Sequence, residues 1–260
     1  MAPESIEIRR VSSVDETRAM TDLLDRIWGQ RMASPEFLRA LATHENPVFG
    51  AFADGEPIGA QVGFLTLIDG APALHSHATG VIPGRQHAGV GFRLKVAQRD
   101  WCLERDIGLM TWTFDPLIAR NAFFNLRKLG CVAREFHRDF YGTMEDDINR
   151  GERSDRLEVR WELRSERVES ALAGTPAVVQ PGEAPALVDR DARAGERSET
   201  QRTFLIRVPS DYPSLKASDP RAARKWRDAV AEAFEWSFAN GFAAVDFLRD
   251  GAYVLVRDAP

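Results

Sequence analysis

The chain has 260 residues, of which 28% are charged and 44% hydrophobic. This composition excludes a mostly disordered chain and predicts one large globular domain or two small ones. No run reaches the roughly 18 apolar residues of a membrane span, and residues 1–10 lack the apolar centre of a secretory signal, so we expect a cytoplasmic protein with no membrane partner. The net charge of −5 argues against nucleic acid as a partner.

Strand and helix signals follow one another through residues 1–165. Ser13 and Glu16 have the spacing of a capping box before a helix, and Ser34-Pro35 opens a second helix. Asp54-Gly55 and Asp69-Gly70 are hairpin signals that join three strands into an antiparallel meander. The predicted strands span 6–11, 48–53, 57–68, 73–82, 109–114, 132–136 and 157–163, and two further helices span 88–105 and 119–129. The helix between strands 73–82 and 109–114 implies a crossover between parallel strands.

The rest of the chain divides into two parts. Residues 174–200 contain prolines, glycines and charges without a hydrophobic period, so we predict a linker or long loop over 166–202. Residues 203–260 predict a β-α-β-β extension with one long helix after Asp219. The extension repeats the strand–helix–strand order found in residues 1–165. It could therefore be a degenerate half of the same fold, packed on the domain formed by residues 1–165.

The strongest chemical signal is the segment QHAGVG at residues 86–91, between a strand and a helix. Glycines at such a turn remove Cβ atoms, and the helix N-terminus adds unpaired N–H donors, an arrangement suited to pyrophosphate. A dinucleotide fingerprint would need a third glycine where Leu94 stands, and a P-loop would need Lys-Ser or Lys-Thr where Phe92-Arg93 stands. A glycine-softened turn that binds nothing is the alternative.

Residues 86–91 resemble the QxxGxG acyl-CoA loop of the GNAT acyltransferase superfamily. Val81-Ile82-Pro83 is similar to the V-x-P at the end of that family's fourth strand, and Lys128-Leu129-Gly130 is similar to the end of its fourth helix. Residues 74–77 (LHSH) and 111–117 (TWTFDPL) resemble a little-characterised subgroup with an extra C-terminal region. The resemblance covers residues 6–163 and implies a mixed α/β fold. In that fold a mostly antiparallel sheet has parallel, splayed fourth and fifth strands, here followed by the β-α-β extension.

The resemblance also implies a co-substrate, acetyl-CoA or another acyl-CoA, and no metal. Its pantetheine lies between the splayed strands beside Val81, and its pyrophosphate faces the amides of the loop. Asn121 contacts the cofactor if it plays the family's role, although its spacing to Gly130 is not the common one. The cofactor-binding residues implied in this way are Val81, Gln86, His87, Ala88, Gly89, Val90, Gly91, Phe92 and Asn121.

One position departs from the family pattern. Many members have a tyrosine four residues before the glycine of K-L-G, where it protonates the departing thiolate, and here that residue is Leu126. Thiolate is a tolerable leaving group near neutral pH, and a general acid contributes about 10² to 10⁴ in rate. Tyr141, close in sequence to the expected cleft, is our candidate to supply the proton.

The candidate base is a histidine. His75 and His77 are two residues apart on a strand and share one face, so either could deprotonate an amine. We prefer His77, which is nearer the thioester end. Hydrogen-bonded structural histidines are the alternative, and a metal pair would lack an evident third ligand.

A carboxylate lies at the end of the predicted fifth strand. Asp115 could orient a histidine or hold a substrate ammonium, or it could be a turn residue before Pro116. On the acceptor side, Asp146 and Asp147 could bind an amine and Arg156 a carboxylate, with structural roles as alternatives. Cys102 and Cys131 are in no recognisable nucleophile context.

Together these residues predict an acyl-CoA-dependent N-acyltransferase, transferring an acetyl or succinyl group to a small-molecule amine such as an amino acid. The alternative is a CoA or acyl-CoA binding protein without turnover, which Leu126 favours. A homodimer is left open by the sequence.

Overall fold

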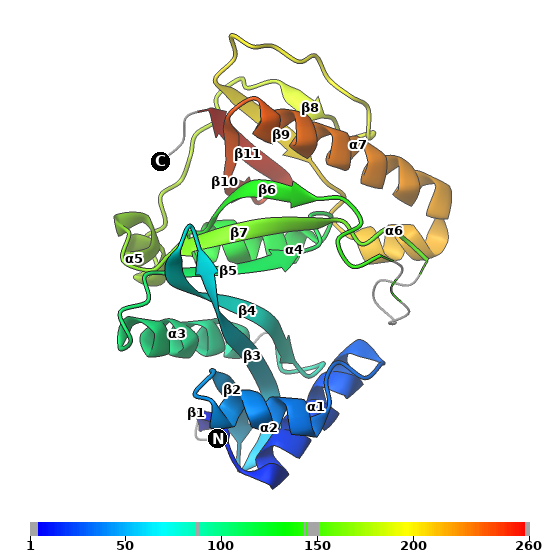
Figure 1. Cartoon of the computed structure of the whole chain (residues 1–260). Helices are drawn as coiled ribbons and strands as arrows, with labels where there is room; N and C mark the ends of the chain where they lie inside the picture. The colour runs from blue at the N-terminus through cyan, green and yellow to red at the C-terminus, as the bar shows by residue number, and fades with distance from the viewer. Residues whose placement is uncertain (1–4, 87–88, 143, 145–150, 258–260) are drawn as a thin grey trace. The chain divides into compact units, whose positions relative to one another are not determined.

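A computed structural model describes residues 5–86, 89–142, 144 and 151–257 of the chain (Figure 1). The described residues form two compact units, one ending at Thr111 and the other beginning at Trp112. We call them unit 1 and unit 2. The division falls inside strand β5 (Leu109–Phe114), which contributes residues to both.

Unit 1 is a meander of strands with three helices. The antiparallel order β1-β2-β3-β4 continues into a parallel β4–β5 pair, and the predicted meander and parallel pair are therefore confirmed. The elements are β1 (Ile6–Arg10), α1 (Val14–Trp28), α2 (Pro35–Thr43), β2 (Val48–Ala53), β3 (Glu56–Ile68), β4 (Ala71–Val81) and α3 (Val90–Leu103).

Local chemistry accounts for the boundaries of these elements. Ser13 caps α1 and forms a full capping box with Glu16, and Ser34 caps α2 at the N–H of Phe37. The hairpin residues Asp54-Gly55 and Asp69-Gly70 all have positive φ, as two-residue hairpin turns require.

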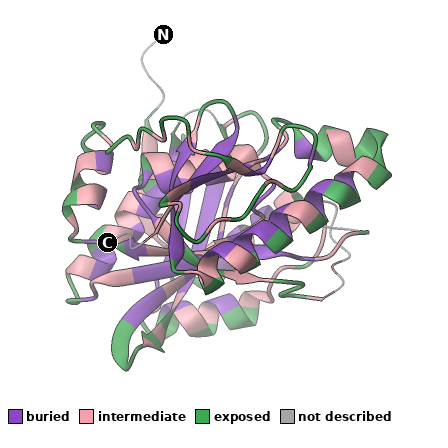
Figure 2. Cartoon of the chain, turned by 90° about the horizontal axis from the view of Figure 1, so that it is seen from above, coloured by how far each residue is buried: buried purple, intermediate pink, exposed green. Residues whose placement is uncertain are grey.

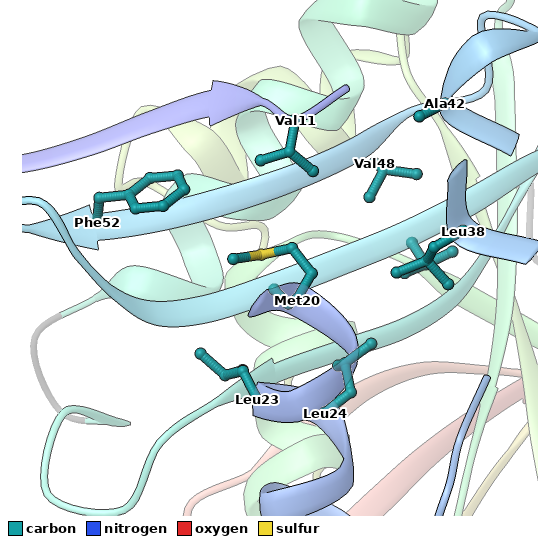
Figure 3. Packing of buried hydrophobic residues seen from close by; sticks show 10 residues of the cluster. Val11, Met20, Leu23, Leu24, Leu38, Ala42, Val48 and Phe52 are labelled. Carbon is teal, nitrogen blue, oxygen red and sulfur yellow. The ribbon is translucent and has the colours of Figure 1, made fainter. Parts of the chain in front are cut away.

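The core of unit 1 lies between α1 and the meander. Met20 and Leu24 of α1 belong to one buried cluster with Val48 and Phe52 of β2. In Figure 3 the α1 side chains point toward these strand residues and toward Val11. Burial of such side chains contributes about 1.5–3 kcal/mol each relative to exposure.

Unit 2 joins the end of β5 to the C-terminal part of the chain. The strand order is β5-β7-β6-β10-β11-β9-β8, antiparallel from β7 to β9 and parallel between β9 and β8. The elements are α4 (Ala119–Ala122), a π-helix η2 (Phe123–Lys128), β6 (Val132–His137), β7 (Arg156–Glu162), α5 (Glu166–Leu172), β8 (Ala186–Val188), β9 (Thr203–Arg207), α6 (Tyr212–Ser218), α7 (Pro220–Ala239), β10 (Phe242–Leu248) and β11 (Ala252–Arg257).

The predicted elements of unit 2 are present, with three additions and one change of type. Helices α5 and α6 and strand β8 were not predicted, and α5 and β8 lie in the segment expected to be a linker. The helix predicted over 119–129 begins as an α-helix and continues as a π-helix. These additions are short, and a seven-residue helix or three-residue strand has too little hydrophobic period to detect in sequence.

Buried residues concentrate on the strands of both units, and the helices carry exposed residues on their outer sides (Figure 2). The C-terminal strands pack with residues 112–144 in one unit, where β10 pairs with β6 and Phe234 of α7 stacks on Phe136 at 5.9 Å. The domain boundary at residue 165 stays a prediction, whereas the compact units divide at 111/112. No helix among the described residues is both long and apolar enough to cross a membrane.

The capping box gives a pH-dependent prediction. Glu16 bonds Arg9, and despite partial burial this contact and the N–H groups of Ser13 and Ser12 lower its pKa from 4.5 to about 2. The stabilisation is complete above pH 4.5 and is lost as the pH falls toward 2. Glu16→Gln should cost on the order of 1–2 kcal/mol of unfolding free energy at pH 7, in urea denaturation, and progressively less below pH 4.5. A difference that grows on acidification would contradict the assignment.

Candidate functional site

The glycine turn forms the head of helix α3. Gly89 is the N-cap with φ 71°, a left-handed conformation that favours glycine, and it has no side-chain cap. The first turn of a helix is where backbone N–H groups can bind an anion. Among the described residues a Cβ on Gly91 would meet only Val81 Cγ2, at 4.0 Å, so they do not require a glycine there.

Gln86 and Val81 lie together beside this turn. The Gln86 side-chain amide donates to the Val81 carbonyl at 3.4 Å, which connects the loop to the end of β4. Val90 is fully buried, whereas Gly91 and Phe92 are half-buried. His87 and Ala88, also predicted to bind the cofactor, lie outside the described residues, as do Asp146 and Asp147.

Strand β4 is irregular where chemistry was expected. Its ladder with β3 passes from Val62↔Ala78 to Gly63↔Ser76, so His77 is the extra residue of a β-bulge. Its parallel ladder with β5 consists of two pairs, the last being His75↔Thr111, while β4 runs on to Val81. The bulge and the short ladder change the direction of the backbone at the carboxyl end of β4.

The two histidines share one face of β4, as predicted. Their ring centroids are 6.1 Å apart, and Phe64 of β3 lies 5.1 Å from the ring of His75 and 5.9 Å from that of His77. His75 Nδ1 lies 3.4 Å from Thr111 Oγ1. Surrounding protein atoms lower the pKa of His77 below its ordinary 6.5, and its side chain is exposed. An accessible imidazole that is neutral at pH 7 is chemically able to accept a proton.

The opposite face of the bulge holds polar residues that the sequence analysis missed. Lys95 of α3 is buried and donates from Nζ to Ser76 Oγ at 2.8 Å. Gln98, one turn later, is fully buried, and its amide has no hydrogen-bond partner among the described residues. A Cβ on Gly63 would come within 2.5 Å of that amide. The only signal was their i, i+3 spacing on the apolar side of α3.

Asp115, a predicted catalytic residue of unit 2, is held in an ion-pair network. Arg227 of α7 donates to both of its carboxylate oxygens, at 2.7 and 2.8 Å, and to Glu152 at 3.0 Å. Tyr212 donates to Glu152 at 2.7 Å. Burial alone would lower the pKa of Arg227, but Asp115 and Glu152 raise it. The Leu117 N–H also bonds Asp115 at 2.9 Å, the contact of a turn residue.

Tyr141, the candidate acid, is also in unit 2. Its side chain is exposed, its hydroxyl lies 3.4 Å from Thr113 Oγ1, and the guanidinium of Arg156 lies 5.3 Å from the centre of its ring. Its N–H donates to Ser154 Oγ at 2.9 Å, which anchors the backbone and leaves the hydroxyl at the surface.

Asn121 and Leu126 belong to the helix that changes type. Asn121 is half-buried in α4. Leu126, at the position where many GNAT members have tyrosine, is fully buried in η2 beside Asn125, whose Oδ1 accepts from Trp112 Nε1 at 3.2 Å. Leu126 is thus an apolar core residue. Burial raises the pKa of the Cys102 thiol to about 12, so it stays protonated at neutral pH.

No family model and no curated protein matches the chain. Solved structures do match it. An inferred acetyltransferase from Acinetobacter baylyi gives a TM-score of 0.52 at 12% identity, over 64% of this chain and 96% of its own length. YncA of Salmonella typhimurium, an inferred acetyltransferase with acetyl-CoA bound, gives 0.51 at 16% identity, over 62% and 96%. The chain has a GNAT-like fold.

The ribosomal-protein-S18-alanine N-acetyltransferase of Escherichia coli gives a TM-score of 0.50 at 14% identity, over 61% of this chain and 94% of that one. At these identities the likeness establishes the fold, including the parallel β4–β5 pair in a mostly antiparallel sheet. The likeness does not assign a role to any single residue of this chain.

The Asp115–Arg227 pair gives a prediction on stability. Asp115→Ala leaves a buried guanidinium without its main partner, so it should cost about 3–5 kcal/mol of unfolding free energy in urea denaturation. The control Asp228→Ala removes an exposed carboxylate from Arg153 and should cost less than about 1 kcal/mol. Equal losses in the two variants would contradict a structural role for the buried pair.

Proposed function

We propose that the protein is an acyl-CoA-dependent N-acyltransferase that acts on a small-molecule amine. The observation that carries the proposal is the head of α3. A left-handed Gly89 opens it, and Gly91 leaves open space next to Val81, the last residue of β4. In a chain with a GNAT-like fold, this is where an acyl-CoA pyrophosphate would meet backbone amides.

We assign each residue a role in acyl-CoA binding from its position within its own unit. The amides from Gly89 to Phe92, together with Gln86, His87 and Ala88, bind the pyrophosphate. Val81 lies along the pantetheine, and backbone N–H groups at the irregular end of β4 polarise the thioester carbonyl. The thioester supplies the acyl group, and direct attack by a neutral amine leaves thiolate.

Proton transfer falls to two side chains in this proposal. His77 takes the proton of the attacking amine, because its lowered pKa keeps the imidazole neutral at pH 7. Tyr141, with its exposed hydroxyl, is proposed to protonate the thiolate. Both carboxylate oxygens of Asp115 accept hydrogen bonds from Arg227, which favours a structural role for Asp115 over a catalytic one. In that role Asp115 fixes the end of β5. Asn121 remains a proposed cofactor contact from α4.

A second candidate is a protein that binds CoA or an acyl-CoA without turnover. Leu126, buried where many family members carry a tyrosine acid, is the observation that favours it. The two candidates differ in one measurement, the release of free thiol from acetyl-CoA and succinyl-CoA across a panel of amines. Binding without thiol release from any amine would favour the second candidate.

The loop assignment is tested by Gly91→Val. The Cβ of the new side chain meets only Val81 Cγ2 at 4.0 Å among the described residues, and the Tm of the unliganded variant verifies that it folds, whereas the pyrophosphate should be displaced. CoA at 100 times its Kd stabilises a protein by about 2.7 kcal/mol, and the resulting rise in Tm should be lost in the variant. Ala97→Val, further along α3, is the control that should keep it. An undiminished CoA shift in Gly91→Val would show that the turn does not bind the cofactor.

The base assignment is tested by the pH dependence of acyl transfer. The rate at saturating acyl-CoA should rise with pH through a pKa below 6.5 as His77 loses its proton, and then level off. His77→Asn should lower kcat by about 10² to 10⁴ and abolish this limb. His75→Asn, on the same strand face, is the matched control, and its rate should still rise with pH as in the wild type. An unchanged profile in His77→Asn would remove the histidine from the mechanism.

A further inference from the structure

Three potential metal ligands meet on strands β6 and β7 of unit 2. Glu135 and His137 lie on β6, Glu158 lies on β7, and one ligand atom from each lies within 4.8 Å of the others. His137 Nε2 and Glu158 Oε2 are 2.9 Å apart. His137 and Glu158 are half-buried and Glu135 is exposed, so a cation could reach them from solvent.

A backbone irregularity brings these side chains together. The β6–β7 ladder passes from Ala133↔Val159 directly to Glu135↔Glu158, so Arg134 is the extra residue of a β-bulge. In a regular ladder Arg134 would face Glu158. The bulge instead places Glu135 opposite Glu158 and puts His137 on the same face.

The bulge places two carboxylates opposite each other beside an imidazole. Two carboxylates directly opposite each other across an antiparallel pair repel, whereas an arginine in the same place would attract. Arg156, opposite His137, donates to the Asp155 carbonyl and to Met144 Sδ and lies against the ring of Tyr141. A bound divalent ion would neutralise the two facing carboxylates and accept the imidazole nitrogen.

The donor set indicates the kind of ion. One imidazole nitrogen and two carboxylate oxygens suit a zinc-type divalent transition ion, bound by three protein ligands with water in the remaining position. Ligands about 2.0 Å from such an ion lie about 3.3 Å apart, so the His137–Glu158 contact needs to open only slightly. The ring of Phe140, 5.0 Å from that of His137, shields one side of the imidazole.

We propose that Glu135, His137 and Glu158 form a binding site for a divalent transition metal ion of the zinc type. The ion joins β6 to β7 beside the bulge. Residues 132–137 and 156–162 gave no spacing signal for such a site, and the sequence analysis expected no metal. The ligands lie on two strands that are separated by many residues in the chain, and the sequence pattern does not indicate the bulge that aligns them.

The site is tested by adding zinc to the full chain, freed of any affinity tag and stripped with a chelator. Isothermal titration should give one Zn²⁺ per chain, and Co²⁺ should give the visible absorption of a four- or five-coordinate ion. His137→Asn and Glu158→Gln should each weaken zinc binding at least about tenfold. Glu162→Gln removes the same charge from β7 outside the cluster and should bind as the wild type does.

The variants change accessible side chains, and their Tm in excess chelator verifies that they fold. Absence of saturable zinc binding, or equal binding by wild type, His137→Asn and Glu158→Gln, would overturn the proposal. Neither readout involves acyl-CoA, so the metal site and the proposed function are tested separately.

Discussion

The neutralisation of one buried guanidinium constrains most of unit 2. Arg227 of α7 is almost fully buried, and a buried cation is tolerated only with opposite charge in hydrogen-bonding contact. Its partners are Asp115, after β5, and Glu152, before β7, so three segments far apart in sequence must converge on one point. Tyr212 of α6 adds a fourth through Glu152. The end of β5 is therefore positioned by the C-terminal part of the chain.

The candidate site at the head of α3 contains no such network of ion pairs among the described residues. At the head of α3 the N-cap Gly89 provides no side-chain cap, a Cβ on Gly91 would meet only Val81 among the described residues, and the ladder between β4 and β5 is short. The buried amide of Gln98 lies under the same strand without a partner among the described residues. Buried polar atoms without a partner among the described residues occur in both units, at Gln98 of unit 1 and at Nε of Arg227 in unit 2.

Local signals explain how far the sequence could predict this structure. Ser13, Ser34 and the hairpin turns at Asp54 and Asp69 act within a few residues, and the helix starts and hairpins that they mark were predicted. The QxxGxG turn and the shared face of the two histidines were also accessible, because both depend on local spacing. The bulges, the π-helix and the pairing of Asp115 with Arg227 depend on partners distant in the chain, and no local pattern encodes them.

The π-helix changes how residues should be counted along this segment. Its hydrogen bonds join residues five apart, so a step of four residues no longer returns to the same face. Counting back from Gly130 to Leu126 crosses this helix, as does the unusual spacing from Asn121 to Gly130. Positions in this segment therefore cannot be assigned to a helix face by counting residues back from Gly130.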